Sequence, residues 1–401
     1  MPEAVIVAAA RSPIGRATKG SLVECRPDDL TATIVRAVLA KVPQIDPDAI
    51  EDLLVGCGEP AGESGFNLAR VVAILAGMPD VPGVTVNRYC SSSLQTISMA
   101  FHAIKAGEGD IFIAAGVETV SRFINGMADI GPHNPLFAQA EERTAELAKG
   151  GVSTWEPPAG LPDVYIAMGQ AAENVRLTEH VSRLEMDEYS ALSQQRAVRS
   201  QQNGFFQREI IPITTPGGAV VNKDDGPRPG TTVEMLAELK PVFRPDGELT
   251  AGNSCPLNDG AAAVVVMSDE KARELGITPL ARIVASGVSA LNPEIRGLGT
   301  IKASRQALSR AGMTINDIDL VEINEDFAAQ VIPSARHLEI PWDKLNVNGG
   351  AIALGHPYGM TGARIMTTLI NDLQTLDGTY GIESMCVAGG MGMAMLVQRL
   401  S

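Results

Sequence analysis

Two parts of this 401-residue chain show the same order of strand-like and helix-like patterns, and this internal repeat constrains the fold most. Near the N-terminus, the apolar runs 50–56 and 84–87 precede a polar turn, a helical pattern and the run 111–116. In the last third, the runs 318–324 and 345–348 precede a glycine-rich turn, a helical pattern and the run 385–390. Short apolar runs between longer helical patterns are typical of α/β proteins with buried sheets. The repeat predicts two similar α/β units whose equivalent strand ends form a shared cleft; a chance likeness is the alternative.

The sequence between the two repeats has a different character. Residues 121–249 contain few strand-like runs and many Pro, Gly, Gln and charged residues. This composition predicts an insertion of helices and loops that is long enough to fold over an active site. We therefore expect a first α/β unit of residues 1–120 plus 250–275, an inserted loop domain of residues 121–249, and a second α/β unit of residues 276–401.

Composition excludes several classes of protein. Apolar residues make up 45% of the chain and charged residues 20%, which excludes intrinsic disorder, collagen and a disulfide scaffold. The formal net charge of −15 argues against binding to nucleic acid or to an anionic membrane. No run reaches the ~18 apolar residues of a membrane span, and no basic segment precedes the N-terminal apolar run. With five scattered cysteines and no CxxC pair, we expect a cytoplasmic protein whose thiols are reduced.

Cys90 is the first residue whose setting indicates chemistry. It lies in Val86-Asn-Arg-Tyr-Cys-Ser-Ser-Ser, at the end of an apolar strand and the start of a helix. A thiol at a helix N-terminus is close to the positive end of the helix dipole and to free backbone N–H groups. These features lower the thiol pKa and can stabilise an oxyanion. We expect a nucleophile, and a buried inert cysteine is the alternative.

A glycine-rich turn presents the second candidate, His356. Five glycines lie between residues 349 and 362, and His356 stands among them, directly after Gly355 and before Pro357. A phosphate-binding loop is the competing interpretation, but the GxxxxGK[ST] pattern is absent. A histidine held in such a turn is suited to acid–base work or oxyanion stabilisation.

Two further clusters follow strands near the C-terminal end. Cys386 closes an apolar run and precedes Val-Ala-Gly-Gly, so its thiol is also expected near free N–H groups. Asn324 ends the run 318–324 and precedes Glu-Asp-Phe. An asparagine at a strand end serves more often as a helix cap than as a catalytic group, so its role stays open on these grounds.

Together the four clusters resemble the motifs of the thiolase family. Cys-x-Ser, Asn-Glu-x-Phe, Gly-His-Pro and a Cys-x-Gly-Gly-like segment occur here in the family's order, and the segments 7–16 and 250–262 are similar as well. The resemblance therefore covers essentially the whole chain. It implies a five-layered αβαβα fold of two α/β units with a loop domain inserted in the first, and a homodimer or homotetramer.

The resemblance also implies a reaction, because thiolases exchange acyl groups between coenzyme A (CoA) thiols through an acyl-cysteine. Cys90 matches the family's nucleophile, His356 the base that activates it, and Cys386 the acid/base that acts at the α-carbon. His356 and a water held by Asn324 would form one oxyanion hole, and the N–H groups of Cys90 and Ala388 the other. CoA and acyl-CoA are then substrates, with no permanently bound cofactor and no metal.

Further positions match CoA-binding residues of the family, and a hydratase/dehydrogenase partner is compatible with the resemblance. Arg228 matches an arginine near the nucleotide part of CoA, and Cys255 stands where a serine often bonds pantetheine. The positions that match the lining of the pantetheine and acyl channel are Met168, Phe243, Ala251 and Phe327.

Departures from the family pattern bear on the substrate. Ser93 and Ala388 stand where glycine is usual, and Asp326 replaces an alanine and adds a carboxylate near the site. Acetoacetyl-specific members carry His-Met-Gly where this chain has Ala167-Met-Gly. The smaller side chain favours a degradative 3-ketoacyl-CoA thiolase, as in fatty-acid β-oxidation, over an acetoacetyl-CoA-specific biosynthetic one. A 3-ketoacyl synthase and a non-catalytic thiolase-like lipid- or acyl-CoA-binding protein are the remaining alternatives.

Overall fold

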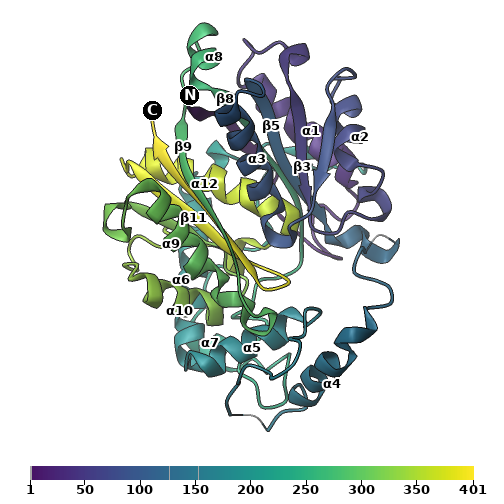
Figure 1. The fold of residues 1–401 in the computed structure, drawn as a ribbon, viewed down its shortest axis with the longest axis vertical. Helices are drawn as coiled ribbons and strands as arrows, with labels where there is room; N and C mark the ends of the chain where they lie inside the picture. The colour runs from purple at the N-terminus through teal and green to yellow at the C-terminus, as the bar shows by residue number, and fades with distance from the viewer. Residues whose placement is uncertain (1, 126, 152) are drawn as a thin grey trace.

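The computed structural model describes residues 2–125, 127–151 and 153–401, and ten of its strands form one continuous sheet (Figure 1). Its path runs β10-β11-β12-β9-β1-β8-β5-β3-β4, with β2 paired to β8. The first half of the sheet contains β1 (Ala4–Arg11), β2 (Gly15–Arg16), β3 (Asp52–Cys57), β4 (Gly83–Val86), β5 (Ile111–Thr119) and β8 (Asn258–Ser268). The second half contains β9 (Ala281–Ala290), β10 (Leu320–Ile323), β11 (Tyr380–Val387) and β12 (Met391–Arg399).

Helices cover both half-sheets and also separate them, so the expected five-layered α/β fold is confirmed. The helices α3 (Ser92–Ala106) and α12 (Thr361–Thr375) lie between the half-sheets and share one apolar core with both. A second core joins the first half-sheet to α1 (Pro27–Ala40) and α2 (Leu68–Leu75). A third core joins the second half-sheet to α9 (Gly299–Ala311) and α10 (Ala328–Leu338).

Local sequence explains how α3 begins and ends. Leu94, Ile97, Phe101 and Ile104 recur at helical spacing, and all four belong to the core between the half-sheets. The helix ends at Gly107, whose left-handed backbone (φ +79°) closes the last turn. The helix is therefore held along its buried face, which fixes the position of its N-terminus.

The predicted repeat is present in the strand pairing. In the first half, β3 pairs in parallel with β4 and β5; in the second, β10 pairs in parallel with β11. The strand predicted over 345–348 is wrong, because this segment contributes only an isolated bridge between Val321 and Leu345. Asn346 has φ +44°, and its side chain both accepts the Ile323 N–H and donates to the Ile323 carbonyl. A side chain thus replaces the ladder that β4 supplies in the first half.

The segment between β5 and β8 rests mainly on the second half of the molecule, although it interrupts the first half in sequence. Residues of this segment, including Ala172, Met186 and Tyr189, belong to the core around α10. Figure 1 shows α4, α5 and α7 gathered beyond one end of the two half-sheets. Its elements are α4 (Ala138–Leu147), α5 (Met168–Thr178), α6 (Arg183–Gln202), β6 (Ile213–Thr214), β7 (Val220–Val221) and α7 (Val233–Ala237).

Short helical elements complete the fold. Two are the α-helices α8 (Asp269–Glu274) and α11 (Ala351–Leu354). The 3-10 helices are η1 (Pro47–Ala49), η2 (Gly62–Ser64), η3 (Tyr89–Ser91), η4 (Val120–Asn125), η5 (Pro135–Phe137), η6 (Phe206–Arg208), η7 (Pro293–Leu298), η8 (Ile315–Asp317) and η9 (Tyr358–Met360). Among the described residues, none of the helices has the length and hydropathy that crossing a bilayer requires.

Candidate active site

Cys90 lies in the turn η3, between the end of β4 and the start of α3. The preceding residue, Tyr89, has φ +43°, a left-handed conformation that makes the turn sharp. The Cys90 side chain is buried, and burial together with the Asp326 carboxylate raises the pKa of the thiol to about 12. The expectation of a lowered thiol pKa is therefore wrong for the free protein, since burial outweighs the helix N-terminus.

The predicted backbone donors act on the Cys90 thiol in the expected sense. The N–H groups of Ala388 and of Cys90 itself oppose the effect of burial and act to lower the thiol pKa. Ala388 follows β11, and the left-handed backbone of this turn falls on Gly389 and Gly390, with φ +74° and +81°. The Cβ of Ala388 is therefore accommodated without strain, and its N–H is retained.

His356 is held by its neighbours on both sides of the ring. Its Nδ1 lies 2.7 Å from the Thr361 hydroxyl oxygen, and that hydroxyl donates to the Pro357 carbonyl at 2.8 Å. The hydroxyl therefore accepts from Nδ1–H, which leaves Nε2 as the unprotonated nitrogen. Burial lowers the pKa of His356 to about 4, so the ring is neutral near pH 7. A neutral imidazole with a free Nε2 can act as a base.

The backbone before His356 requires a glycine. Gly355 has φ +110°, and a Cβ there would lie 2.4 Å from the side chain of Asn258. The same asparagine accepts the backbone N–H of His356 at 3.1 Å. The turn that carries the histidine is thus pinned to the start of β8 in the first half of the molecule.

Asn324 and Asp326 follow β10 and lie between His356 and Cys90. The Asn324 amide nitrogen lies 3.4 Å from both ring nitrogens of His356 and contacts the Asp326 carboxylate. Asp326 Oδ1 lies 3.5 Å from His356 Nε2. One polar atom from each of Cys90, Asp326 and His356 lies within 4.8 Å of the other two. A metal ion could bridge such a spacing, but Arg296 already pairs with Asp326, so we assign no metal to this group.

Cys386, the second thiol, ends β11 beside the same carboxylate. Its sulfur lies 3.1 Å from Asp326 Oδ2 and 3.2 Å from Gln330 Oε1. The Arg296 Nη1 atom lies 3.7 Å from this sulfur and 3.3 Å from Asp326 Oδ2. Burial is the main cause that raises the pKa of the Cys386 thiol well above its usual range. The structure therefore brings Cys90, His356 and Cys386 around one carboxylate.

The positions that match CoA-binding residues of the family lie in two places. Phe243 and Phe327 stack edge to face with ring centroids 5.6 Å apart, and Met168 packs in the same core. Arg228 and Ala251 line a separate pocket of about 230 Å³. Cys255 donates its backbone N–H to the Asp326 carbonyl at 2.9 Å, which places it next to Asp326.

A cavity of about 450 Å³ opens beside the backbone donors of the site. Tyr89, Met168 and Ala388 line the part next to Cys90. Ala167 lines it too, at the position where the sequence indicated extra room. The cavity therefore lies next to the residues that flank Cys90 and Cys386 in sequence, and polar side chains such as Asp129 and His133 form part of its lining.

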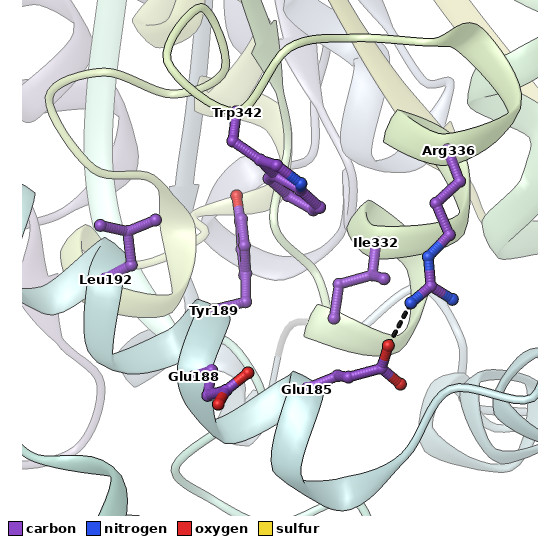
Figure 2. A pocket seen from close by; sticks show the side chains of 7 residues that line it. All are labelled: Glu185, Glu188, Tyr189, Leu192, Ile332, Arg336 and Trp342. Atoms are coloured by element: carbon purple, nitrogen blue, oxygen red, sulfur yellow. Dashed lines mark hydrogen bonds and ion pairs between the residues drawn. The ribbon is translucent and has the colours of Figure 1, made fainter.

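A second groove lies on the outer surface, between α6 and α10. Figure 2 shows its lining, in which Arg336 pairs with Glu185 and the rings of Tyr189 and Trp342 lie next to each other at a tilt of 52°. No thiol or imidazole lines it, so it lacks the reactive groups that the first cavity adjoins. The hydroxyl of Tyr189 donates to Glu325 at 2.7 Å, which connects the groove only to the support of the site.

Two family models together span nearly the whole chain. The model described as thiolase, N-terminal domain, matches residues 4–270, and the model described as thiolase, C-terminal domain, matches residues 277–399. The chain belongs to the thiolase family. The order of the four clusters along the chain agrees with this membership.

Relatives with assigned names are similar over their full lengths. The chain is 41% identical over 412 residues to the 3-oxoadipyl-CoA/3-oxo-5,6-dehydrosuberyl-CoA thiolase of Escherichia coli (strain K12), covering 100% of both proteins. It is 40% identical to the 3-ketoacyl-CoA thiolase of Bacillus subtilis (strain 168), covering 98% of both. The crystal structure of the Bacillus anthracis acetyl-CoA acetyltransferase aligns with a TM-score of 0.85 at 35% identity, covering 100% of this chain and 99% of that one.

Sequence reasoning missed several groups that hold the site of this thiolase together. Glu325 accepts from Tyr189, Ser193 and Asn346, and so fixes the strand end that carries Asn324. Arg296, on η7, is fully buried against Asp326. The sequence signal for Arg296 was weak, because an arginine in a loop gives no indication of burial. Only the extra carboxylate of Asp326 hinted that a cation would be needed.

Proposed function

We propose that this thiolase cleaves 3-ketoacyl-CoA with CoA to acetyl-CoA and a shortened acyl-CoA, through an acyl thioester on Cys90. The reverse reaction, a Claisen condensation, follows the same steps backwards. The observation that supports this most is the convergence of two thiols and a neutral imidazole on the Asp326 carboxylate. A single nucleophile would suffice for acyl transfer, whereas breaking a C–C bond also requires a group that handles a proton on carbon.

His356 starts the reaction in this proposal. Its Nε2 takes the proton of the Cys90 thiol, and the resulting thiolate attacks C3 of the 3-ketoacyl group. The backbone N–H groups of Cys90 and Ala388 stabilise the oxyanion that forms at C3. The raised thiol pKa and the lowered imidazole pKa keep both groups neutral until substrate is present.

Cys386 acts in the second step of the proposal. When the C2–C3 bond breaks, its electron pair passes to C2, and the Cys386 thiol gives its proton to that carbon. His356 and a water held by Asn324 stabilise the enolate oxygen of the departing acetyl-CoA. The incoming CoA thiol then returns a proton to the Cys386 thiolate and attacks the acyl-Cys90 thioester. The Cys90 thiolate leaves and recovers its proton from His356, which restores the starting state.

The cavity beside Ala388 is the observation that favours a 3-ketoacyl chain longer than acetoacetyl as the proposed substrate. Ala167 occupies its wall with the smallest side chain that carries a Cβ. Its other lining residues include Asp129, and His133 in the same wall is paired with Glu141 at 2.8 Å. The Asp129 carboxylate, which lies beside that of Glu59, would oppose the terminal carboxylate of a dicarboxylic acyl group. We therefore propose uncharged 3-ketoacyl-CoA substrates of six or more carbons, as in degradative β-oxidation.

Binding of CoA and assembly complete the proposal. The pocket of Arg228 and Ala251 is the proposed place for the nucleotide and pantetheine parts of CoA, because its arginine can pair with a phosphate. Met168, Phe243, Cys255 and Phe327 are proposed to line the channel. A homodimer or homotetramer and a hydratase/dehydrogenase partner stay predictions, which sedimentation and co-purification would test.

An acetyl group on Cys90 is the deciding observation for this proposal. The protein is mixed with acetyl-CoA or acetoacetyl-CoA, and the intact mass and the peptides are measured. We expect one acetyl adduct on the peptide that contains Cys90 and none in the Cys90→Ala variant. Absence of the adduct, or its survival in the variant, would instead favour the non-catalytic acyl-CoA-binding alternative.

A further inference from the structure

The sulfur of Cys386 lies among polar groups that a buried thiol does not require. Asp326 Oδ2 is 3.1 Å from it, Gln330 Oε1 is 3.2 Å from it, and Arg296 Nη1 is 3.7 Å from it. Arg296 and Asp326 form an ion pair whose side chains are 1% and 2% exposed. A full positive and a full negative charge are therefore packed against a thiol in a dry part of the protein.

This ion pair is poorly explained by stability. Taking two charges out of water costs free energy that their attraction repays only when their remaining hydrogen bonds are satisfied. Here Nε and Nη2 of Arg296 have no partner among the described residues, although both atoms are buried. A pair that is imperfectly satisfied and in contact with a reactive thiol indicates a functional role.

We propose that Asp326, with Arg296 as its counter-ion, is a positioning residue that holds Cys386 as a protonated thiol and sets the pH at which that thiol ionises. The inference rests on the proposed function, since it concerns the proton that Cys386 gives to carbon. The thiol donates to the Asp326 carboxylate, which is the nearer and the charged one of its two acceptors. Gln330 supplies a second acceptor from α10 on the same side.

The charges around Cys386 act in opposite directions. Asp326 opposes a second negative charge on the sulfur, whereas Arg296 favours it. The remaining titratable group that faces this thiol is Cys90, on η3, which also disfavours its ionisation. His356 reaches Cys386 only across Asp326, and it is neutral. With burial added, these groups keep the proton on Cys386 near pH 7.

This arrangement favours the protonation state that thiolysis needs. The Cys386 thiol must carry a proton when the C2–C3 bond breaks. The electron pair of that bond stays on C2, and it forms the new bond to the proton that Cys386 gives up. The thiolate left behind lies beside Arg296 and regains a proton from the incoming CoA thiol. Asp326 thus favours the protonated Cys386 thiol before proton transfer. Arg296 lowers the free energy of the Cys386 thiolate that proton transfer leaves behind.

A titration of the Cys386 thiol tests the inference without catalysis. In a Cys90→Ala background, thiolate formation is followed by ultraviolet absorbance against pH, and the signal of a matched protein that also carries Cys386→Ala is subtracted. Asp326→Asn keeps an oxygen that can accept from the thiol but removes the charge. We expect its thiolate to form at least about one pH unit lower, a tenfold gain at a given pH. Arg296→Gln should shift thiolate formation the other way.

The opposite shifts separate a positioning role from a structural one, because simple loosening of the site would move both variants alike. Asp28→Asn serves as the matched control, since Asp28 is a buried carboxylate that pairs with Arg26 at the start of α1. It should leave the titration of Cys386 unchanged. Equal titrations in all proteins, including the case in which no thiolate forms while they stay folded, would overturn the inference. If Asp326→Asn does not fold, the Arg296→Gln variant decides alone. The inference is then overturned if the Cys386 thiolate of Arg296→Gln forms at the same pH as in the protein without this substitution.

A second measurement connects the titration to the reaction. With Cys90 intact, solvent deuterium exchange into the acetyl methyl group of acetyl-CoA is followed against pH. We expect Asp326→Asn to move the rising limb of this profile to lower pH while Cys90 is still acetylated. Loss of the acetyl adduct in the unaltered protein would count against the proposed function. An intact adduct with an unmoved profile would count against the role of Asp326.

Discussion

The hydroxyl oxygen of Thr361 lies 2.7 Å from Nδ1 of His356 and is itself anchored through its proton to the Pro357 carbonyl. The first residue of α12 therefore selects the tautomer of the histidine that stands in the preceding turn. Rotation of the ring would break this hydrogen bond. The Asn324 amide nitrogen, which lies 3.4 Å from Nε2, also restricts the ring. The helix thus sets which nitrogen of the base is free to accept a proton.

Replacement of Thr361 by valine should slow the reaction while the protein stays folded. Valine has a similar shape but removes the acceptor for Nδ1–H, so the ring loses its preferred tautomer. We expect kcat to fall by about tenfold to a hundredfold, a part of the usual contribution of a general base. Thr361→Ser keeps the hydroxyl and should retain most of the activity. Steady-state kinetics with a 3-ketoacyl-CoA decide, and equal rates in all three proteins would refute the assignment.

Removal of the second thiol should separate the two halves of the reaction. Cys386→Ala leaves Cys90, His356 and the backbone donors in place, so transfer of an acetyl group to Cys90 should continue in part. Thiolysis and condensation should fall below detection, because no group then handles the proton at C2. Mass spectrometry of Cys90 and an assay of acetyl-CoA formation measure the two activities side by side. An equal loss of both would show that Cys386 has another role.

Substitution at the cavity wall should change the length of the acyl chain that is accepted. Ala167→His fills part of the cavity beside Ala388, so kcat/KM should drop about tenfold or more for chains of six or more carbons. Acetoacetyl-CoA should be affected much less, because its acyl chain is at least two carbons shorter. Ala167→Ser, a smaller change at the same position, serves as the control. A kinetic series over chain length that shows a uniform loss would contradict this interpretation.

Acid should destabilise the protein through His356. Burial lowers its pKa from 6.5 to about 4 in the folded state, so between these values the unfolded chain binds more protons than the folded one. The free energy of unfolding therefore rises with pH across this window, and acidification from 6.5 to 4 removes up to about 3 kcal/mol. Denaturant unfolding of the unaltered protein and of His356→Gln at several pH values isolates this contribution. A difference between the two proteins that is independent of pH would contradict the linkage.

Much of this site was predictable from residue patterns, because reactive residues followed strands and the strands repeated. Cys90, His356, Cys386 and Asn324 were each chosen from a short motif, and the structure brings all four together. Parallel strands in equivalent units end at the same edge, so residues far apart in sequence could be expected to meet. Their meeting around one carboxylate was not expected, since that depends on the side-chain direction at Asp326.

Two expectations failed for physical reasons that a linear pattern does not contain. The prediction of a strand over 345–348 is wrong because the side chain of Asn346 bonds to the N–H and the carbonyl of Ile323. In a strand, backbone groups would have made these two hydrogen bonds. The prediction of a lowered thiol pKa for Cys90 is wrong because burial raises this pKa more than the end of the helix lowers it. Burial depends on how the whole protein packs, which a local motif does not show. Arg296 was missed because its partner lies 30 residues away in sequence and on another element.

The reactive groups come from both halves of the repeat. The turn after β4 supplies Cys90 from the first half, whereas the second half supplies Cys386 near the end of β11 and His356 before α12. A half-length chain with one such unit would carry a single thiol at its strand end. Such a chain could assemble this set of groups only by pairing with a copy of itself. Two units in one chain allow equivalent strand ends to hold different groups, so that one thiol can attack carbon while the other transfers a proton.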